Sequence, residues 1–155
     1  MAVSALTGHG DPDFLALSPA TVSPERVALV GLHEWTDDDI PNVAAWNIRS
    51  FSPDDVRSST RPLLDWLAGT GCTRVAIHFD VDTVDSDEVV LGLGAVPHGL
   101  RSDEIRRIVA EITAAADVVG LTIAEYFPRQ VMRVQQLLQG FPLISPTTTA
   151  VTPVG

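Results

Sequence analysis

The sequence predicts an α/β fold in which three layers, helix, sheet and helix, are built on a mainly parallel sheet. Short apolar runs alternate with segments that carry helix signals, and this alternation is typical of βαβ units with parallel strands. The chain has 155 residues and is 45% hydrophobic, which suits one hydrophobic core. Acidic residues follow the most regular apolar run, and ligands of such sheets bind outside the carboxyl ends of the strands.

Four segments are predicted to be strands. The clearest is Arg74 to Phe79, which is mostly apolar and ends in a cluster of acids. The run Val27 to Leu32 is short, β-branched at its start and bounded by polar residues, as buried parallel strands are. The other two are Trp46 to Phe51 and Val118 to Ile123.

Two helices are predicted before the clearest strand. The first begins after Ser52, a capping residue that is followed by a proline and two aspartates. The second runs from Arg61 to Ala68, with Leu63, Leu64 and Leu67 facing inward and with Gly69 near its C-terminal end.

The second half of the chain is predicted to hold a long loop and two helices. The Gly-rich segment Asp85 to Leu100 is the loop. A helix starts at Ser102, where apolar residues recur at i, i+3, i+4 and i+7. The last helix begins at Pro128 and ends at Gly140. Residues 1–144 are interpreted as one domain and the Thr- and Pro-rich residues 145–155 as a mobile tail.

The composition excludes several classes of function. The formal net charge of -10 argues against binding to nucleic acid. All ten basic residues are arginines, so a mechanism that needs a lysine nucleophile or Schiff base is excluded within this chain. Cys72 is the single cysteine, which excludes an intramolecular disulfide and fits a cytoplasmic location. A signal peptide and an apolar run of membrane-spanning length are not found, so a membrane partner is not expected.

Three carboxylates are the candidate site. In an extended chain Asp80 and Asp82 project from one face, about 6 to 7 Å apart. Carboxylates so close repel each other unless a cation such as Mn²⁺ or Mg²⁺ lies between them, although acids that merely cap a strand end in solvent are an equal alternative. Glu125 follows the strand Val118 to Ile123, which places it at the same rim unless it serves only the next helix start. The three together suit a metal on one side and a planar guanidinium on the other.

These residues lie in two motifs that resemble the ureohydrolase family of arginases, agmatinases and formiminoglutamases. The family pattern is an SxDxDxxDP strand end, a Gly-rich loop, a GGLT-E helix start and a GLDxxEVNP strand. The chain has FDVDTVDSDEVVLGLGAVPHGLRSDE followed by DVVGLTIAEYFP, in the same order and with the expected helix between them. The resemblance runs from about Val27 to Leu143.

The resemblance implies an arginase-like fold, a site and a reaction. Asp80 and Asp82 match the family's manganese ligands, the first bridging two Mn²⁺ ions and the second binding one. Glu125 matches the carboxylate that receives the guanidinium or formimino group of a small substrate. In this family a metal-bridging hydroxide attacks the amidine carbon and a C–N bond is hydrolysed.

The chain also departs from the family pattern. The His and the Asp-Ala-His-x-Asp motif that supply four further ligands are absent. In the family pattern a His-Gly follows them. The first residues resemble the segment after that His-Gly, so the chain is interpreted as the C-terminal part of the family domain. Metal binding by this chain alone is then expected to be weak, and a second copy or a separate N-terminal half is the expected partner.

Smaller departures concern histidines and one serine. Ser86 replaces the proline of the DP pair, and His98 replaces the first glycine of the GGL turn. His78 shares a strand face with the aspartates, but a buried, hydrogen-bonded role is expected rather than metal binding. His9 and His33 are expected to be structural or surface residues.

Two other functions fit parts of the sequence. A non-catalytic assembly or regulatory module with the same fold would explain the missing ligands. A phosphatase of the haloacid dehalogenase type would use Asp80 as nucleophile and Asp82 as acid and base, but it needs a cation, usually lysine, to hold the phosphoryl group.

Overall fold

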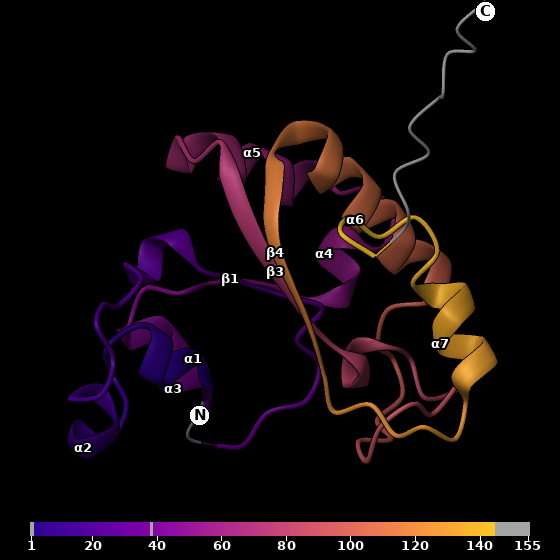
Figure 1. Cartoon of the computed structure of the whole chain (residues 1–155), viewed down its shortest axis with the longest axis horizontal. Coiled ribbons are helices and arrows are strands. Elements are labelled where there is room, and N and C mark those ends of the chain that lie inside the picture. The colour runs from indigo at the N-terminus through magenta and orange to yellow at the C-terminus, as the bar shows by residue number, and fades with distance from the viewer. Residues whose placement is uncertain (1, 38, 145–155) are drawn as a thin grey trace, which may run out of the picture. The chain divides into compact units, whose positions relative to one another are not determined.

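The computed structural model describes residues 2–37 and 39–144 (Figure 1). The chain divides into two compact units, Met1–Thr70 and Gly71–Gly155. The predicted mobile tail, residues 145–155, lies outside the described residues. Among the helices of the described part, none is long and apolar enough to span a membrane.

The first unit is built on a short parallel pair of strands. β1 (Ala28–Val30) pairs with β2 (Arg49–Phe51), with Ala28 beside Arg49 and Val30 beside Phe51. Both strands are shorter than the predicted segments, although both lie within them. The helices of this unit and one 3-10 turn are α1 (Ala2–Leu6), α2 (Pro12–Leu15), η1 (Pro24–Arg26), α3 (Asp39–Ala45), α4 (Pro53–Arg57) and α5 (Arg61–Thr70).

A capping box fixes the start of α4, as the sequence predicts. The Ser52 hydroxyl accepts a hydrogen bond from the Asp55 amide, and the Asp55 carboxylate accepts one from the Ser52 amide at 2.8 Å. The buried core of this unit includes Phe51, Val56 and the α5 residues Leu63 and Leu67. The Leu64 side chain is only half-buried.

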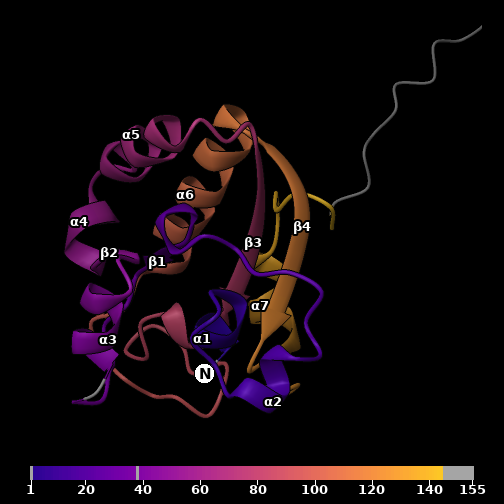
Figure 2. The same ribbon diagram turned by 90° about the vertical axis from the view of Figure 1, so that its left-hand side faces the viewer.

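The second unit is built on a longer parallel pair, which runs side by side in both views (Figures 1 and 2). β3 (Arg74–Asp80) pairs with β4 (Asp117–Ala124) from Arg74 beside Asp117 to Asp80 beside Ala124. Between them lie the turn η2 (Val81–Thr83) and the helix α6 (Ser102–Ala115), and α7 (Val131–Leu137) follows β4.

The amphipathic helix α6 contacts both β4 and α7. It buries Ile105, Ile108 and Val109, which recur at the predicted helical spacing. Phe79 on β3 makes an edge-to-face contact with Phe141, with 5.6 Å between the ring centroids. The parallel register of β3 and β4 sets their carboxyl ends next to each other.

Several details differ from the predicted elements. Gly69 lies inside α5, and Gly71, with φ of +69°, makes the turn that follows this helix. The last helix begins at Val131 rather than Pro128, because Gln130 is its N-cap. The described strands form two hydrogen-bonded parallel pairs rather than one continuous ladder. The helices α1, α2 and α3 were not predicted, because none of them is longer than seven residues.

Candidate functional site

The Asp-x-Asp pair lies where β3 ends, but it is not extended as predicted. Asp80 is the last residue of β3, and its Oδ1 accepts a hydrogen bond from the backbone N–H of Asp82 at 3.0 Å. This bond caps the 3-10 turn η2, which contains Asp82. The strand geometry used to place the two carboxylates is therefore wrong beyond Asp80, because a local side-chain hydrogen bond turns the chain.

A Gly-rich loop holds the second carboxylate. Gly94 donates its backbone N–H to Asp82 Oδ2 at 3.2 Å. A Cβ atom built on Gly92 would collide with Asp82 Oδ1, and one built on Gly94 would collide with Oδ2. Only glycine lets the loop backbone approach this carboxylate so closely. Gly92 and Gly94 were predicted only as part of the Gly-rich loop, although their alternation in Leu-Gly-Leu-Gly was a usable signal.

Glu125 lies at the neighbouring strand end. It directly follows Ala124, which pairs with Asp80 in the register of β3 and β4. Its side chain is exposed and its φ is +60°, an uncommon conformation for a residue with a Cβ atom. Such strain is found often where a side chain must be aimed.

The same loop touches both strand ends. The backbone N–H of Phe127 donates to the carbonyl of Leu91 at 3.0 Å. The Glu125 carbonyl oxygen lies 2.7 Å from the position that a Cβ atom on Gly92 would occupy. The structure thus brings the backbone at Glu125 and the carboxylate of Asp82 to one loop segment, Leu91 to Gly94.

The loop is closed at its base by backbone contacts. Leu100 donates to the Thr83 carbonyl at 2.9 Å, and Asp85 donates to the Leu100 carbonyl at 2.9 Å. A Cβ atom on Gly99 would lie 2.7 Å from the Thr83 carbonyl oxygen, which explains the glycine at this position. His98, where the family pattern has a glycine, adopts φ of +72° and donates its backbone N–H to Asp85 Oδ1 at 3.2 Å.

The histidines have local roles. His78 is exposed rather than buried, and its Nδ1 lies 2.6 Å from Thr122 Oγ1 across the β3–β4 ladder. The expectation that it is buried is therefore wrong, because one face of this strand pair is open in the second unit. His9 stacks on Trp46 with 4.5 Å between ring centroids, and His33 Nδ1 lies 2.9 Å from the Gly31 carbonyl.

The donor chemistry of Asp80 and Asp82 suits a hard divalent cation, which prefers carboxylate oxygen. The number of donors is small, however. Within residues 2–37 and 39–144, no group of three or more His, Cys, Asp or Glu side chains is arranged to hold a metal ion. The two aspartates fit part of a metal site, and further ligands are needed to complete it.

Solved structures with a similar fold are arginases and related proteins. An arginase from Entamoeba histolytica, solved in complex with L-ornithine, matches with a TM-score of 0.76 and 18% identity over 91% of this chain and 52% of that protein. An arginase from Bacillus subtilis matches with a TM-score of 0.75 and 16% identity over 93% and 56%. A hypothetical agmatinase from Burkholderia thailandensis matches with a TM-score of 0.57 and 22% identity over 77% and 36%. The chain thus spans about half the length of the arginases that it matches.

These matches confirm the predicted α/β, arginase-like fold. Among curated protein sequences, none matches this chain. The model of the arginase family matches residues 4–136, a range that includes β3, the Gly-rich loop, β4 and the three carboxylates. This range is most of the sequence, and the chain therefore belongs to the arginase family.

Proposed function

We propose that this chain supplies part of the active site of a manganese-dependent hydrolase that cleaves a C–N bond of a guanidino or formimino compound. The observation that carries the proposal is the arrangement at the ends of β3 and β4. Asp80 and Asp82 follow one strand, Glu125 follows its neighbour, and the Leu91 to Gly94 loop touches both ends. Membership of the arginase family favours this chemistry over that of a phosphatase.

In this proposal the two aspartates hold metal. Asp80 is fixed through Oδ1 by the Asp82 amide, and Asp82 is fixed through Oδ2 by the Gly94 amide. Both carboxylates are therefore oriented before a cation arrives, which lowers the entropy lost on binding. Bound Mn²⁺ would supply an activated water for the hydrolysis next to these two aspartates.

Glu125 is proposed to hold the substrate. Its exposed carboxylate at the strand end is a suitable acceptor for a guanidinium or formimino group through paired hydrogen bonds. The positive φ at Glu125 sets the direction of the side chain relative to β4. A single carboxylate binds a planar, cationic group best, and this preference indicates guanidino or formimino compounds as the substrate class.

The proposed metal site needs further ligands, since the described residues provide no group of three donors. We propose that a further polypeptide segment completes it, which either carries the rest of the family domain or belongs to another copy of the chain. The span of about half of each matched arginase supports the first alternative. The exposed His78–Thr122 face of the β3–β4 pair supports both, because an open sheet face is commonly covered in an assembly.

A Mn²⁺ titration of the purified chain tests the ligand assignment. Wild type is expected to bind weakly, Asp82→Ala to lose that binding, and Glu125→Gln to keep it. Equal Mn²⁺ affinity in wild type and Asp82→Ala would overturn the assignment. A guanidinium titration in the presence of Mn²⁺ tests Glu125, whose Gln variant is expected to bind guanidinium more weakly without any change in metal affinity.

The small donor set favours a second candidate function, a non-catalytic module that keeps the arginase fold for assembly or regulation. Urea release from arginine and agmatine separates the two functions. The assay requires Mn²⁺ and a polypeptide that carries the other half of the family domain. Turnover that disappears in Glu125→Gln supports the hydrolase, and complex formation without turnover supports the module.

A further inference from the structure

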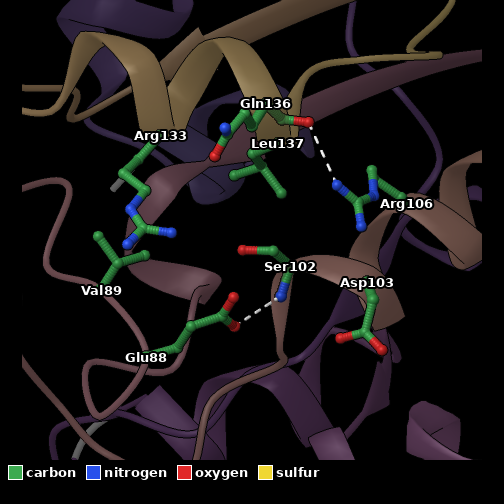
Figure 3. A pocket seen from close by; sticks show the side chains of 8 residues that line it. All are labelled: Glu88, Val89, Ser102, Asp103, Arg106, Arg133, Gln136 and Leu137. Carbon is green, nitrogen blue, oxygen red and sulfur yellow. Dashed lines mark hydrogen bonds between the residues drawn. The ribbon is translucent and has the colours of Figure 1, made fainter.

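A cavity of about 200 Å³ lies in the second unit, between the start of α6, the side of α7 and the Glu88–Val89 part of the loop (Figure 3). This volume holds a small ligand together with a few waters. It is lined by residues that have no part in the proposed hydrolase chemistry. Figure 3 shows the guanidinium groups of Arg106, on α6, and Arg133, on α7, on its walls.

These two arginines differ from most others in the chain. Arg57, Arg61, Arg74, Arg101 and Arg107 each lie within 4 Å of a carboxylate, at distances from 2.8 to 3.9 Å. Among the described residues, neither Arg106 nor Arg133 has a carboxylate oxygen within 4.0 Å. Two guanidinium groups that have no carboxylate partner in the described part of the chain thus line one cavity, together with the carboxylates of Glu88 and Asp103.

The two carboxylates in the cavity wall are paired with groups other than these two guanidinium groups. Glu88 Oε2 accepts a hydrogen bond from the backbone N–H of Ser102 at 2.8 Å, drawn as a dashed line in Figure 3. Asp103 Oδ1 lies 3.9 Å from Arg101 Nε. Each acid therefore has its own partner, and the two guanidinium groups retain donors for a ligand.

The position of Arg106 is fixed. Its side chain is half-buried, and Nη1 donates to the backbone carbonyl of Gln136 at 3.3 Å. A guanidinium group has five N–H donors, so this single bond leaves others for a ligand in the cavity. Ser102 adds a hydroxyl to the same wall.

We infer that this cavity binds a small oxyanion, a carboxylate or phosphate group held between Arg106 and Arg133. Guanidinium groups bind both anions through paired, charge-assisted hydrogen bonds. The loop residues in the cavity wall, Glu88 and Val89, belong to the segment that continues to Gly92 and Gly94. A ligand in the cavity would therefore contact the loop that holds Asp82.

The test is a chemical-shift titration of the arginine Nε–H and backbone amide signals with inorganic phosphate and, separately, with acetate. Chloride at equal ionic strength is the reference, because a general salt effect moves signals across the whole surface. We expect saturable shifts at Arg106 and Arg133. Saturation by phosphate alone assigns the cavity to a phosphorylated ligand, and saturation by both anions assigns it to oxyanions generally.

Three variants make the test specific. Arg133→Gln and Arg106→Gln are each expected to weaken binding about tenfold or more, since each removes a charge-assisted hydrogen bond. Arg107→Gln, on the same helix with the same change in charge, is the matched control and is expected to bind as wild type. The Arg133 side chain makes no hydrogen bond within the described part of the chain, so its variant keeps the α6–α7 contact that Arg106 makes.

Two results would overturn the inference. The first is phosphate and acetate shifts no larger than those with chloride. The second is equal affinity in wild type, Arg133→Gln and Arg107→Gln, which would mean an adventitious ion only. A hydrogen–deuterium exchange measurement of α6 and α7 in each variant separates lost binding from lost folding.

Discussion

The acidic residues after β2 and after β3 look alike in sequence but are used differently. After β2, the Asp55 carboxylate accepts hydrogen bonds from the amide and the hydroxyl of Ser52, both at 2.8 Å and three residues away. After β3, the Asp82 carboxylate accepts one from Gly94, twelve residues away. The first acid caps a helix, and the second is held by a distant loop.

The difference shows how to separate a structural acid from a site candidate. The partners of Asp55 lie within one helical turn and complete a helix cap, which accounts for an acid at this strand end without any further role. Asp82, in contrast, is contacted by a loop segment that is distant in sequence, and only glycine fits at Gly92 and Gly94 of that segment. Such an acid is a candidate for a functional site. Substitutions at the two places are therefore expected to have different consequences.

The largest effect is expected from Gly94→Ala. Its Cβ atom would collide with the Asp82 carboxylate, so the free energy of unfolding is expected to fall by about 1–3 kcal/mol. Gly69→Ala is the matched control. That glycine lies within α5 with nothing within 4 Å of an added Cβ, and the change is expected to stabilise by roughly 0.5–1 kcal/mol.

Urea unfolding of both variants measures the contrast, and the Mn²⁺ titration is repeated on each. Gly94→Ala is expected to weaken metal binding, whereas Gly69→Ala is expected to leave it unchanged. If the two alanine variants had the same stability, the loop would not be packed against Asp82 as described.

A smaller effect is expected at the local acid. Ser52→Ala removes the capping hydroxyl of α4 and is expected to lower the free energy of unfolding by about 1 kcal/mol. Ser58→Ala, at the other end of α4, is the control and should change stability much less. Mn²⁺ binding should be the same in both, and a loss of binding in Ser52→Ala would contradict the separation of the two acids.

His98→Gly tests the base of the loop. His98 adopts φ of +72°, and a glycine there relieves roughly 1 kcal/mol of backbone strain. Gly140→Ala is the opposite change, because Gly140 has φ of +84°, and it is expected to destabilise by about 1 kcal/mol. Thermal unfolding compares both with wild type, and a lower melting temperature for His98→Gly would show that the imidazole contributes more than the strain costs.

The smallest effect concerns pH. The hydrogen bonds from the Ser52 side chain and then its backbone amide lower the pKa of Asp55. A lowered pKa in the folded state gives stability that is present above the ordinary aspartate pKa, near 4, and is lost as the pH falls through the folded pKa. Ser52→Ala should therefore raise the pKa of Asp55 and flatten the pH dependence of stability below about pH 4. A carboxyl NMR titration checks it, and an unchanged Asp55 pKa would contradict the cause given.

Much of the second unit could be predicted from the sequence. The apolar periodicity and the turn residues predicted four features of this unit. These are the span of β3, the Asp85 to Leu100 loop, the start of α6 at Ser102, and β4 to within one residue at each end. The predicted start of α4 is confirmed as well, because a capping box acts over three residues. In the first unit, α1, α2 and α3 have at most seven residues, too few for a periodic pattern to be recognised.

By itself, then, the sequence determined the family, the succession of strands along the chain and the place of Asp80, Asp82 and Glu125 where strands end, because motif order and apolar period are local properties. The tertiary structure decided what holds those residues. It showed that Asp80 turns the chain into η2, that Gly92 and Gly94 pack against Asp82, and that Arg106 and Arg133 line one cavity. The physical reason is that contacts between distant segments depend on how helices and loops fold back onto the strands. The periodicity of side chains along the sequence does not predict these contacts.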